Sequence, residues 1–252
     1  MSDFQSPTQP ERDQSADALA RAMQTLIEAG KILAHLGHGD MTRGHVSVRL
    51  PGEPTLFLMK SHSVGLDEIT PDNVLTIGLD GAVVSGSARR HSEVYIHSEI
   101  YRARADVGAV IHTHPTHIVA LSATGRPLRP LCQGGALFAG HLPAFELTMD
   151  LIRSPETGRQ VAEALGPHQA VLMRSHGVAM TGRTLEEAMI GCVMLEEAAR
   201  VQLLAEAAGI DAPDFPLEDV ARLRDNLMRP EQHGVNFAYL VRRANRAMAG
   251  GK

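Results

Sequence analysis

The stretch GAVIHTHPTHIVAL, residues 108–121, decides how this sequence is interpreted, because it joins a strand pattern to a cluster of histidines. The apolar run at 109–111 is typical of a buried strand. His112 and His114 then occupy alternate positions at its end, before Pro115. Residues i and i+2 of a strand point to the same face, so we expect the two imidazoles to lie side by side. In that arrangement their ring nitrogens can bind one metal ion, at about 2.0–2.1 Å each for zinc.

The composition sets limits on the class of protein. The chain has 252 residues, a formal net charge of −5 and 44% hydrophobic residues, which is typical of one globular domain. It contains no dense basic run, so we expect no nucleic-acid partner. It also has no apolar run as long as a membrane span and no signal-peptide core, so we expect no membrane partner and a cytoplasmic location. Cys132 and Cys192, without a CxxC motif, fit a reducing compartment.

Hydrophobic periodicity predicts a single α/β domain over residues 16–252, after a polar tail at 1–15 that we expect to be mobile. Helical spacing predicts helices at 17–36, 92–107, 116–125, 157–166 and 184–209, and looser helical structure from about 216. Strand patterns occur at 45–50, 55–60, twice within 73–86, at the stretch quoted above, and twice within 170–182. The first four strands follow one another closely, which favours antiparallel pairing.

Two further residues become candidates for the same site when His112 and His114 are considered with them. His176 ends an apolar run and is followed by a glycine that permits a tight turn, so it is a candidate third ligand. Glu93 opens a predicted helix, where the helix dipole alone also favours a carboxylate. Three histidines leave one metal position for water, substrate or a carboxylate, which is the layout of a catalytic site. For His97, one turn after Glu93, we expect only a weak helix-surface pair.

The sequence resembles the class II aldolase and adducin-head family from roughly residue 20 to 210. Five segments carry the resemblance, in this order: GHVSVR (44–49), SEVYIH (92–97), VIHTHP (110–115), RSHGV (174–178) and TLEEAM (184–189). The resemblance implies a single-domain α-β-α layered fold with a central, mainly antiparallel sheet. It implies one divalent metal ion per subunit (zinc, manganese or another transition metal) on His112, His114 and His176, with Glu93 as catalytic acid/base. It also implies a homotetramer with the site near the subunit interface.

The expected site departs from the sugar-phosphate aldolases of this family. Those enzymes hold phosphate with a Gly-Asn pair, a Thr-Gly turn and a Ser-Ser pair, and the matching positions here read Gly44–His45, His62–Ser63 and His91–Ser92. Imidazolium groups with Lys60 nearby would attract a planar carboxylate. The candidate substrate-binding residues are therefore His45, His62, Arg90, His91 and Ser92. In the alternative, these histidines point elsewhere and phosphate is held differently.

The aldolase proton donor has no counterpart in the matching segment, residues 130–140, which contains no tyrosine. Aldol cleavage would need His141 or Tyr239 instead, whereas decarboxylation needs no such donor. We therefore expect a metal-dependent C–C lyase for a small carboxylate, working through a metal-stabilised enolate: a decarboxylase of a hydroxylated aromatic or heteroaromatic dicarboxylate. The alternatives are a class II (retro-)aldolase or epimerase on a sugar phosphate or sugar acid, although the family's epimerases carry aspartate where Glu93 stands. An adducin-like interaction module, which lacks the metal ligands, is the remaining alternative.

Overall fold

A central sheet organises the chain in a computed structural model that describes residues 9–209, 211, 213, 215–227 and 229–250. The strands are β1 His45–Leu50, β2 Glu53–Lys60, β3 Val74–Gly78, β4 Val83–Ser85, β5 Ala109–Thr113, β6 Ala144–Phe145, β7 Ala170–Met173 and β8 Gly177–Gly182. They form one sheet in the order β4-β3-β2-β1-β5-β8-β7-β6. Within these residues only the short β6–β7 pair is parallel. The predicted mainly antiparallel sheet is therefore confirmed.

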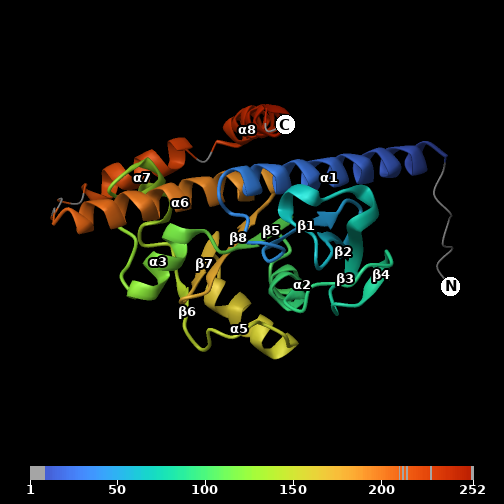
Figure 1. The fold of residues 1–252 in the computed structure, drawn as a ribbon, viewed down its shortest axis with the longest axis horizontal. Coiled ribbons are helices and arrows are strands. Elements are labelled where there is room, and N and C mark those ends of the chain that lie inside the picture. Colours follow the sequence, from blue (N-terminus) through green and yellow to red (C-terminus); the bar gives the residue numbers. More distant parts are fainter. Residues whose placement is uncertain (1–8, 210, 212, 214, 228, 251–252) are drawn as a thin grey trace.

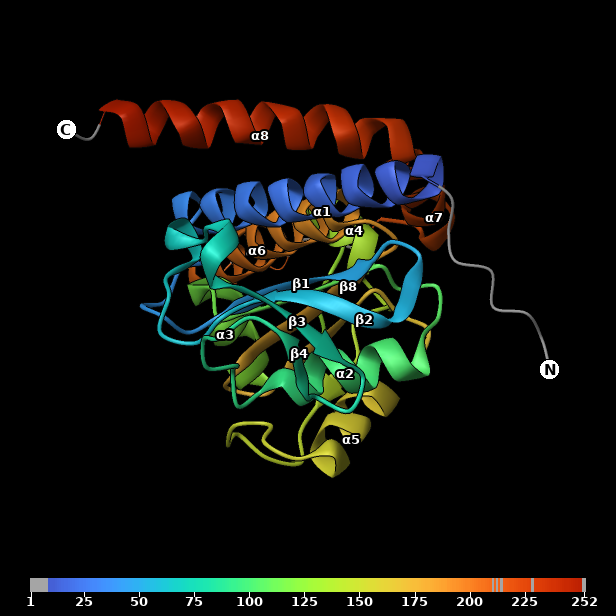
Figure 2. The ribbon, with the colours of Figure 1, turned by 90° about the vertical axis from the view of Figure 1, so that its right-hand side faces the viewer.

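Helices cover both faces of the sheet (Figure 1, Figure 2). They are α1 Gln9–His35, α2 Val94–Ala103, α3 Thr116–Thr124, α4 Gln133–Phe138, α5 Pro155–Leu165, α6 Leu185–Ala207, α7 Leu217–Leu227 and α8 Pro230–Gly250, with 3₁₀ turns at Leu66–Glu68 and Pro71–Asn73. Figure 2 shows α1, α6 and α8 on one side of the sheet and α2 and α5 on the other. The predicted α-β-α layering is thus present in one domain. No helix among the described residues is long and apolar enough to cross a membrane.

Strand β5 is buried on both faces, which explains its uninterrupted apolar run. Ala109 and Ile111 belong to the core on the α1 and α6 side, whereas Val110 belongs to the core on the α2 and α5 side. Alternation along the strand then directs His112 to the same side as Val110. Because β5 lies in the middle of the sheet, His112 enters the interior of the molecule and is fully buried.

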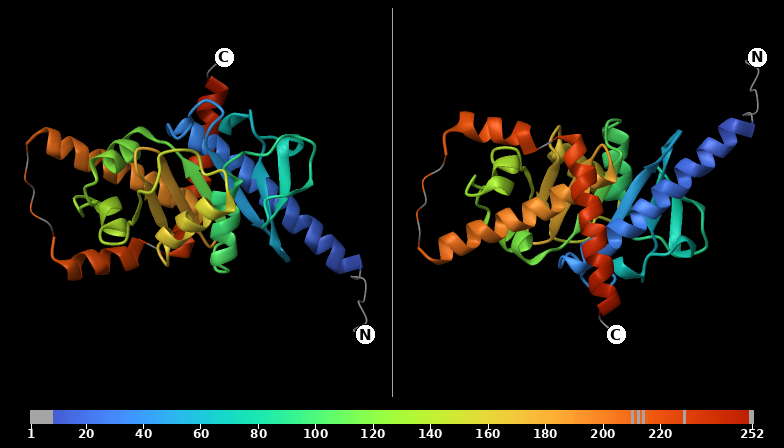
Figure 3. Two further views of the ribbon diagram at one scale, coloured as in Figure 1. Left: turned by 90° about the horizontal axis from the view of Figure 1, so that it is seen from below. Right: turned by 90° about the horizontal axis from the view of Figure 1, so that it is seen from above.

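The N-terminal boundary differs from the prediction. Helix α1 begins at Gln9, so residues 9–15 of the predicted mobile tail are helical, while residues 1–8 lie outside the described residues. Pro10 is compatible with this because the first turn of a helix needs no N–H from it. Figure 3 shows that the N-terminal part of α1 extends past the edge of the sheet. The sequence of this part therefore lacks the periodic apolar residues from which a helix can be predicted.

Candidate metal centre

Strand register brings the first histidines together. His112 of β5 lies opposite His45 of β1 and opposite Ala179 of β8. Directly paired residues of antiparallel strands point to the same face, so the His45 and His112 rings are neighbours, with centroids 4.9 Å apart. The site therefore lies at the end of three adjacent central strands.

The tight turn between β7 and β8 delivers the third predicted ligand. Ser175 takes a left-handed conformation with φ 56°, and His176 follows it. A Cβ on Gly177 would lie 2.4 Å from the Thr113 carbonyl oxygen and 2.7 Å from the His114 ring, so only glycine allows this close approach. The glycine thus places the His176 ring beside the end of β5.

His112, His114 and His176 lie close together at the end of β5. The Nε2 atoms of His112 and His114 are 3.0 Å apart. His112 Nδ1 lies 3.0 Å from the Val178 carbonyl oxygen, so Nδ1 carries the proton and donates it, which leaves the Nε2 lone pair free. The His176 ring is stacked on that of His114, with centroids 5.2 Å apart. All three residues offer a nitrogen within 4.8 Å of one another.

The donor set fits a divalent metal ion. His176 Nδ1 is buried without a hydrogen-bond partner among the described residues, and His114 Nδ1 is 3.4 Å from Asp40 Oδ2. Neutral imidazole is a ligand that zinc, copper, iron and nickel accept. Burial lowers the pKa of His176 to about 4 and lowers that of His114, so both rings are neutral at neutral pH and their lone pairs are available.

Glu93 lies against these rings, at the N-cap position of α2. Its Oε1 accepts a hydrogen bond from the Ile152 N–H at 3.0 Å and lies 3.7 Å from His176 Nε2. Its Oε2 lies 3.8 Å from His45 Nε2. Burial raises the pKa of Glu93 above its ordinary value, which suits a group that takes up and releases a proton.

The predicted substrate-binding residues separate into two groups. His45, His91 and His62 form a row from the centre outward, with ring centroids 4.7 Å and then 5.3 Å apart. Ser92 is half-buried between His91 and Glu93 in the chain. Arg90 instead places its guanidinium over the Tyr95 ring, at 5.5 Å, and donates to the His91 carbonyl oxygen.

The histidines of this row are not the imidazolium groups expected from the sequence. Burial, together with the neighbouring Lys60 charge, lowers the pKa of His91 to about 3. Burial also lowers the pKa of His45 well below its ordinary value. At neutral pH both rings are therefore neutral, and they can only donate or accept hydrogen bonds. The pattern of residues could not reveal this because the burial results from β1 and α2 covering the rings.

His97 is the largest departure from the prediction. Its side chain is fully buried, not at the helix surface. Its Nε2 is 2.6 Å from His45 Nδ1, and its Nδ1 is 2.7 Å from Ser47 Oγ. Helix α2 carries these contacts because the face with His97 packs on the sheet. The i, i+4 spacing from Glu93 was the available signal, since it places both residues on one helix face.

A groove of about 540 Å³ opens beside the cluster. Its lining includes the polar residues Asp40, Arg43, His114, Thr116, Ser175 and His176, and the apolar residues Val119, Ala120, Met149 and Leu151. Arg43 donates to Asp40 at 2.8 Å. The loops that supply Asp40, Arg43, Met149 and Leu151 have no periodic pattern, so sequence reasoning missed them.

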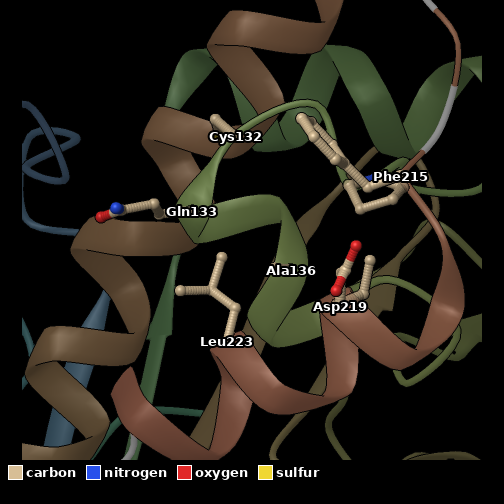
Figure 4. A pocket seen from close by; sticks show the side chains of 8 residues that line it. Cys132, Gln133, Ala136, Phe215, Asp219 and Leu223 are labelled. Carbon is tan, nitrogen blue, oxygen red and sulfur yellow. The ribbon is translucent and has the colours of Figure 1, made fainter.

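A second pocket, of about 390 Å³, lies between α4 and α7 (Figure 4). It is lined by Pro130, Cys132, Gln133, Ala136, Phe215, Asp219, Val220 and Leu223. None of these residues belongs to the histidine cluster, and the lining is mainly apolar. The candidate site is therefore the groove beside His114 and His176.

Comparisons with known proteins show the family and the fold of the chain. The family described as "Class II Aldolase and Adducin N-terminal domain" matches residues 24–203. The chain is 38% identical to "Decarboxylase NovR" of Streptomyces niveus, over 73% of this chain and 68% of that protein. It is 29% identical to a 3,4-dihydroxyphthalate decarboxylase of Arthrobacter keyseri, over 82% of this chain and 87% of that protein. An L-fuculose 1-phosphate aldolase from Glaciozyma antarctica has the same fold, with a TM-score of 0.83 and 24% sequence identity. The match covers 97% of this chain and 95% of that protein.

Proposed function

We propose a metal-dependent decarboxylase activity for this chain, which belongs to the class II aldolase and adducin N-terminal domain family because the match covers residues 24–203. The substrate would be a hydroxylated aromatic or heteroaromatic dicarboxylate. The observation that carries the proposal is the convergence of His112, His114 and His176 beside Glu93, next to a groove whose lining includes His114, His176 and several apolar residues. Relatives that are named decarboxylases support the choice of reaction.

The groove favours a flat, partly apolar substrate. Val119, Ala120, Met149 and Leu151 offer apolar contacts to a ring, which a sugar with hydroxyls on every carbon would use poorly. Arg43, which also lines the groove, can pair with a substrate carboxylate, since a guanidinium binds a planar carboxylate through two N–H groups. His45, His62, His91 and Ser92 are not among the residues that line the groove; the three histidines, neutral because their pKa values are lowered, would offer a substrate that reaches them hydrogen bonds instead of charge.

The proposed mechanism assigns the metal ligands to His112, His114 and His176. When bound, a divalent cation supplies positive charge that stabilises the electron pair released as the carbon–carbon bond breaks. Carbon dioxide leaves, and the electron pair stays on the ring carbon. Glu93, whose pKa is raised by burial, then takes up a proton from water and delivers it to that carbon. Ile152 N–H holds the Glu93 carboxyl in place.

An aldol cleavage is less well supported. The two residues that could have replaced the missing tyrosine lie elsewhere: Arg224 Nη1 is 2.7 Å from His141 Nε2, and Tyr239 is about half exposed on α8. Neither lines the groove. A homotetramer with the site near a subunit interface remains part of the proposal, and a neighbouring subunit could then supply further groups.

Product analysis tests the proposal. We expect the purified protein, loaded with zinc or with manganese, to release carbon dioxide from hydroxylated aromatic dicarboxylates. The same preparation should release little aldehyde from L-fuculose 1-phosphate. Aldehyde release from a sugar phosphate, without carbon dioxide from any member of the dicarboxylate panel, would replace the decarboxylase with the aldolase alternative.

A further inference from the structure

A chain of hydrogen bonds runs from the candidate site into the core between the sheet and α2. Its members are His45, His97, Ser47 and Tyr101, all buried. The consecutive distances are 2.6 Å from His45 Nδ1 to His97 Nε2, 2.7 Å from His97 Nδ1 to Ser47 Oγ, and 2.8 Å from Ser47 Oγ to the Tyr101 hydroxyl. His97 uses one ring nitrogen for each neighbour, and Ser47 Oγ contacts both His97 and Tyr101, so the direction of one bond constrains the next.

Tyr101, at the inner end of this chain of hydrogen bonds, determines which atom is the donor in each bond. Burial raises the pKa of Tyr101, so its hydroxyl keeps its proton. Ser47 Oγ lies 2.8 Å from that hydroxyl, which also contacts the Val110 backbone, and we assign Tyr101 as the donor to Ser47. Ser47 then donates to His97 Nδ1 at 2.7 Å in preference to the Val110 carbonyl oxygen at 3.5 Å. A neutral His97 with an acceptor at Nδ1 carries its proton on Nε2.

The same constraint passes to His45. His97 Nε2–H donates to His45 Nδ1, so the neutral His45 ring carries its proton on Nε2. That atom is buried, has no hydrogen-bond partner among the described residues, and faces Glu93 Oε2 at 3.8 Å. The opposite direction would leave a lone pair on Nε2 pointing at the Glu93 carboxylate, which is electrostatically unfavourable.

We propose that the chain Tyr101–Ser47–His97 fixes His45 as the tautomer with its proton on Nε2. His45 is then a neutral donor aimed at the substrate oxygen that gains negative charge beside Glu93, while His97, Ser47 and Tyr101 are positioning residues. A donor held in place before the reaction stabilises developing charge without reorganisation. The tautomer assignment stands by itself, and the role in turnover rests on the proposed function.

Nitrogen-15 NMR of the metal-free protein tests the tautomer without any turnover. We expect His45 to show a protonated Nε2 and an unprotonated Nδ1, with the resonances assigned by their loss in His45→Asn. In Tyr101→Phe the inner donor is gone, so Ser47 can donate to Val110 and accept from His97. The His45 signals should then move toward the other tautomer. An unprotonated His45 Nε2 in the unmodified protein would overturn the proposal, whether or not the protein is a decarboxylase.

Kinetics of the metal-loaded protein test the role in turnover. For Tyr101→Phe and for Ser47→Ala we expect kcat to fall about 10-fold, as is usual when an outer partner of a site histidine is lost. KM and metal content should change less than about twofold, because neither variant removes a ligand or a substrate contact. Tyr95→Phe removes a hydroxyl from the same helix outside the chain and should match the unmodified protein. Unchanged His45 signals and unchanged kcat in both chain variants would show that the chain does not position His45.

Discussion

The histidines on the two sides of His112 differ in how their nitrogens are used. On the groove side, defined by His114 and His176, the rings stack on each other, and His176 Nδ1 has no hydrogen-bond partner within the described chain. On the sheet side, defined by His45 and His97, both nitrogens of His97 are bonded, and His45 retains only Nε2. Burial is common to both sides. A ring can be a ligand only where the fold leaves a nitrogen unused, a condition that His45 also meets and His97 does not.

Charge does not distinguish the two sides. Burial lowers the pKa of His176 on the groove side to about 4 and that of His97 on the sheet side to about 3. Rings of both groups are therefore neutral at neutral pH. The difference lies in access, because His114 and His176 line the groove and His97 does not. His114 and His176 thus differ from His97 in their access to the groove and not in their charge.

The largest effect is expected from His112→Ala. It removes a central ligand, so metal affinity should fall by more than about 100-fold, beyond what loss of an outer partner costs, and activity should disappear with it. The sheet should persist because the neighbouring core residues are apolar. Elemental analysis after dialysis measures the metal content, and circular dichroism monitors the fold.

The matched control for that variant is His91→Gln on the sheet side. It changes a buried histidine that is not one of the three proposed ligands, so metal content should be retained. Equal metal loss in His91→Gln and His112→Ala would erase the proposed separation between the two sides.

Glu93→Gln should have the next largest effect. The amide keeps the shape of the side chain but carries no transferable proton, so kcat should fall about 10²–10⁴-fold, the usual contribution of a general acid or base. Metal should remain on the three histidines. Single-turnover kinetics with measured metal content check both statements. A variant that loses metal, and recovers its rate when metal is added back, would make Glu93 a ligand without a role in proton transfer.

The sequence predicted the parts of the site that depend on a regular strand or a nearby glycine. The spacing of His112 and His114 determined their common face, and Gly177 indicated the turn beside His176. The state of His45 and the burial of His97 could not be predicted, because both depend on how α2 packs against β1 and not on local pattern. Arg43 and Met149 were missed for another reason: they lie in loops, where no periodicity links a residue to the site.

The smallest expected effect concerns Lys60, which adjoins the sheet side and is fully buried. Its Nζ donates to the carbonyl oxygens of Thr42 and Val64, at 3.2 and 2.6 Å, and lies 3.0 Å from His91 Nε2. Burial lowers the pKa of Lys60 from 10.5 to about 8. Between these two pH values the unfolded chain holds a proton that the folded chain has lost, so the free energy of unfolding should rise with pH across this window.

Across this pH window the free energy of unfolding should rise by at most about 3 kcal/mol. This rise should be absent in Lys60→Met, which has no titrating group at this position. Lys31→Met, which removes a lysine from α1, should keep the gain. Urea unfolding of the three metal-free proteins between pH 8 and 10.5 gives the free energy of unfolding of each as a function of pH. The effect of Lys60 is the difference between these curves, because all other titrating groups are shared. Parallel curves for all three proteins would mean that Lys60 keeps an ordinary pKa. The carbonyl oxygens around it would then solvate its charge, and a positive charge next to His91 would persist on the sheet side throughout this pH range.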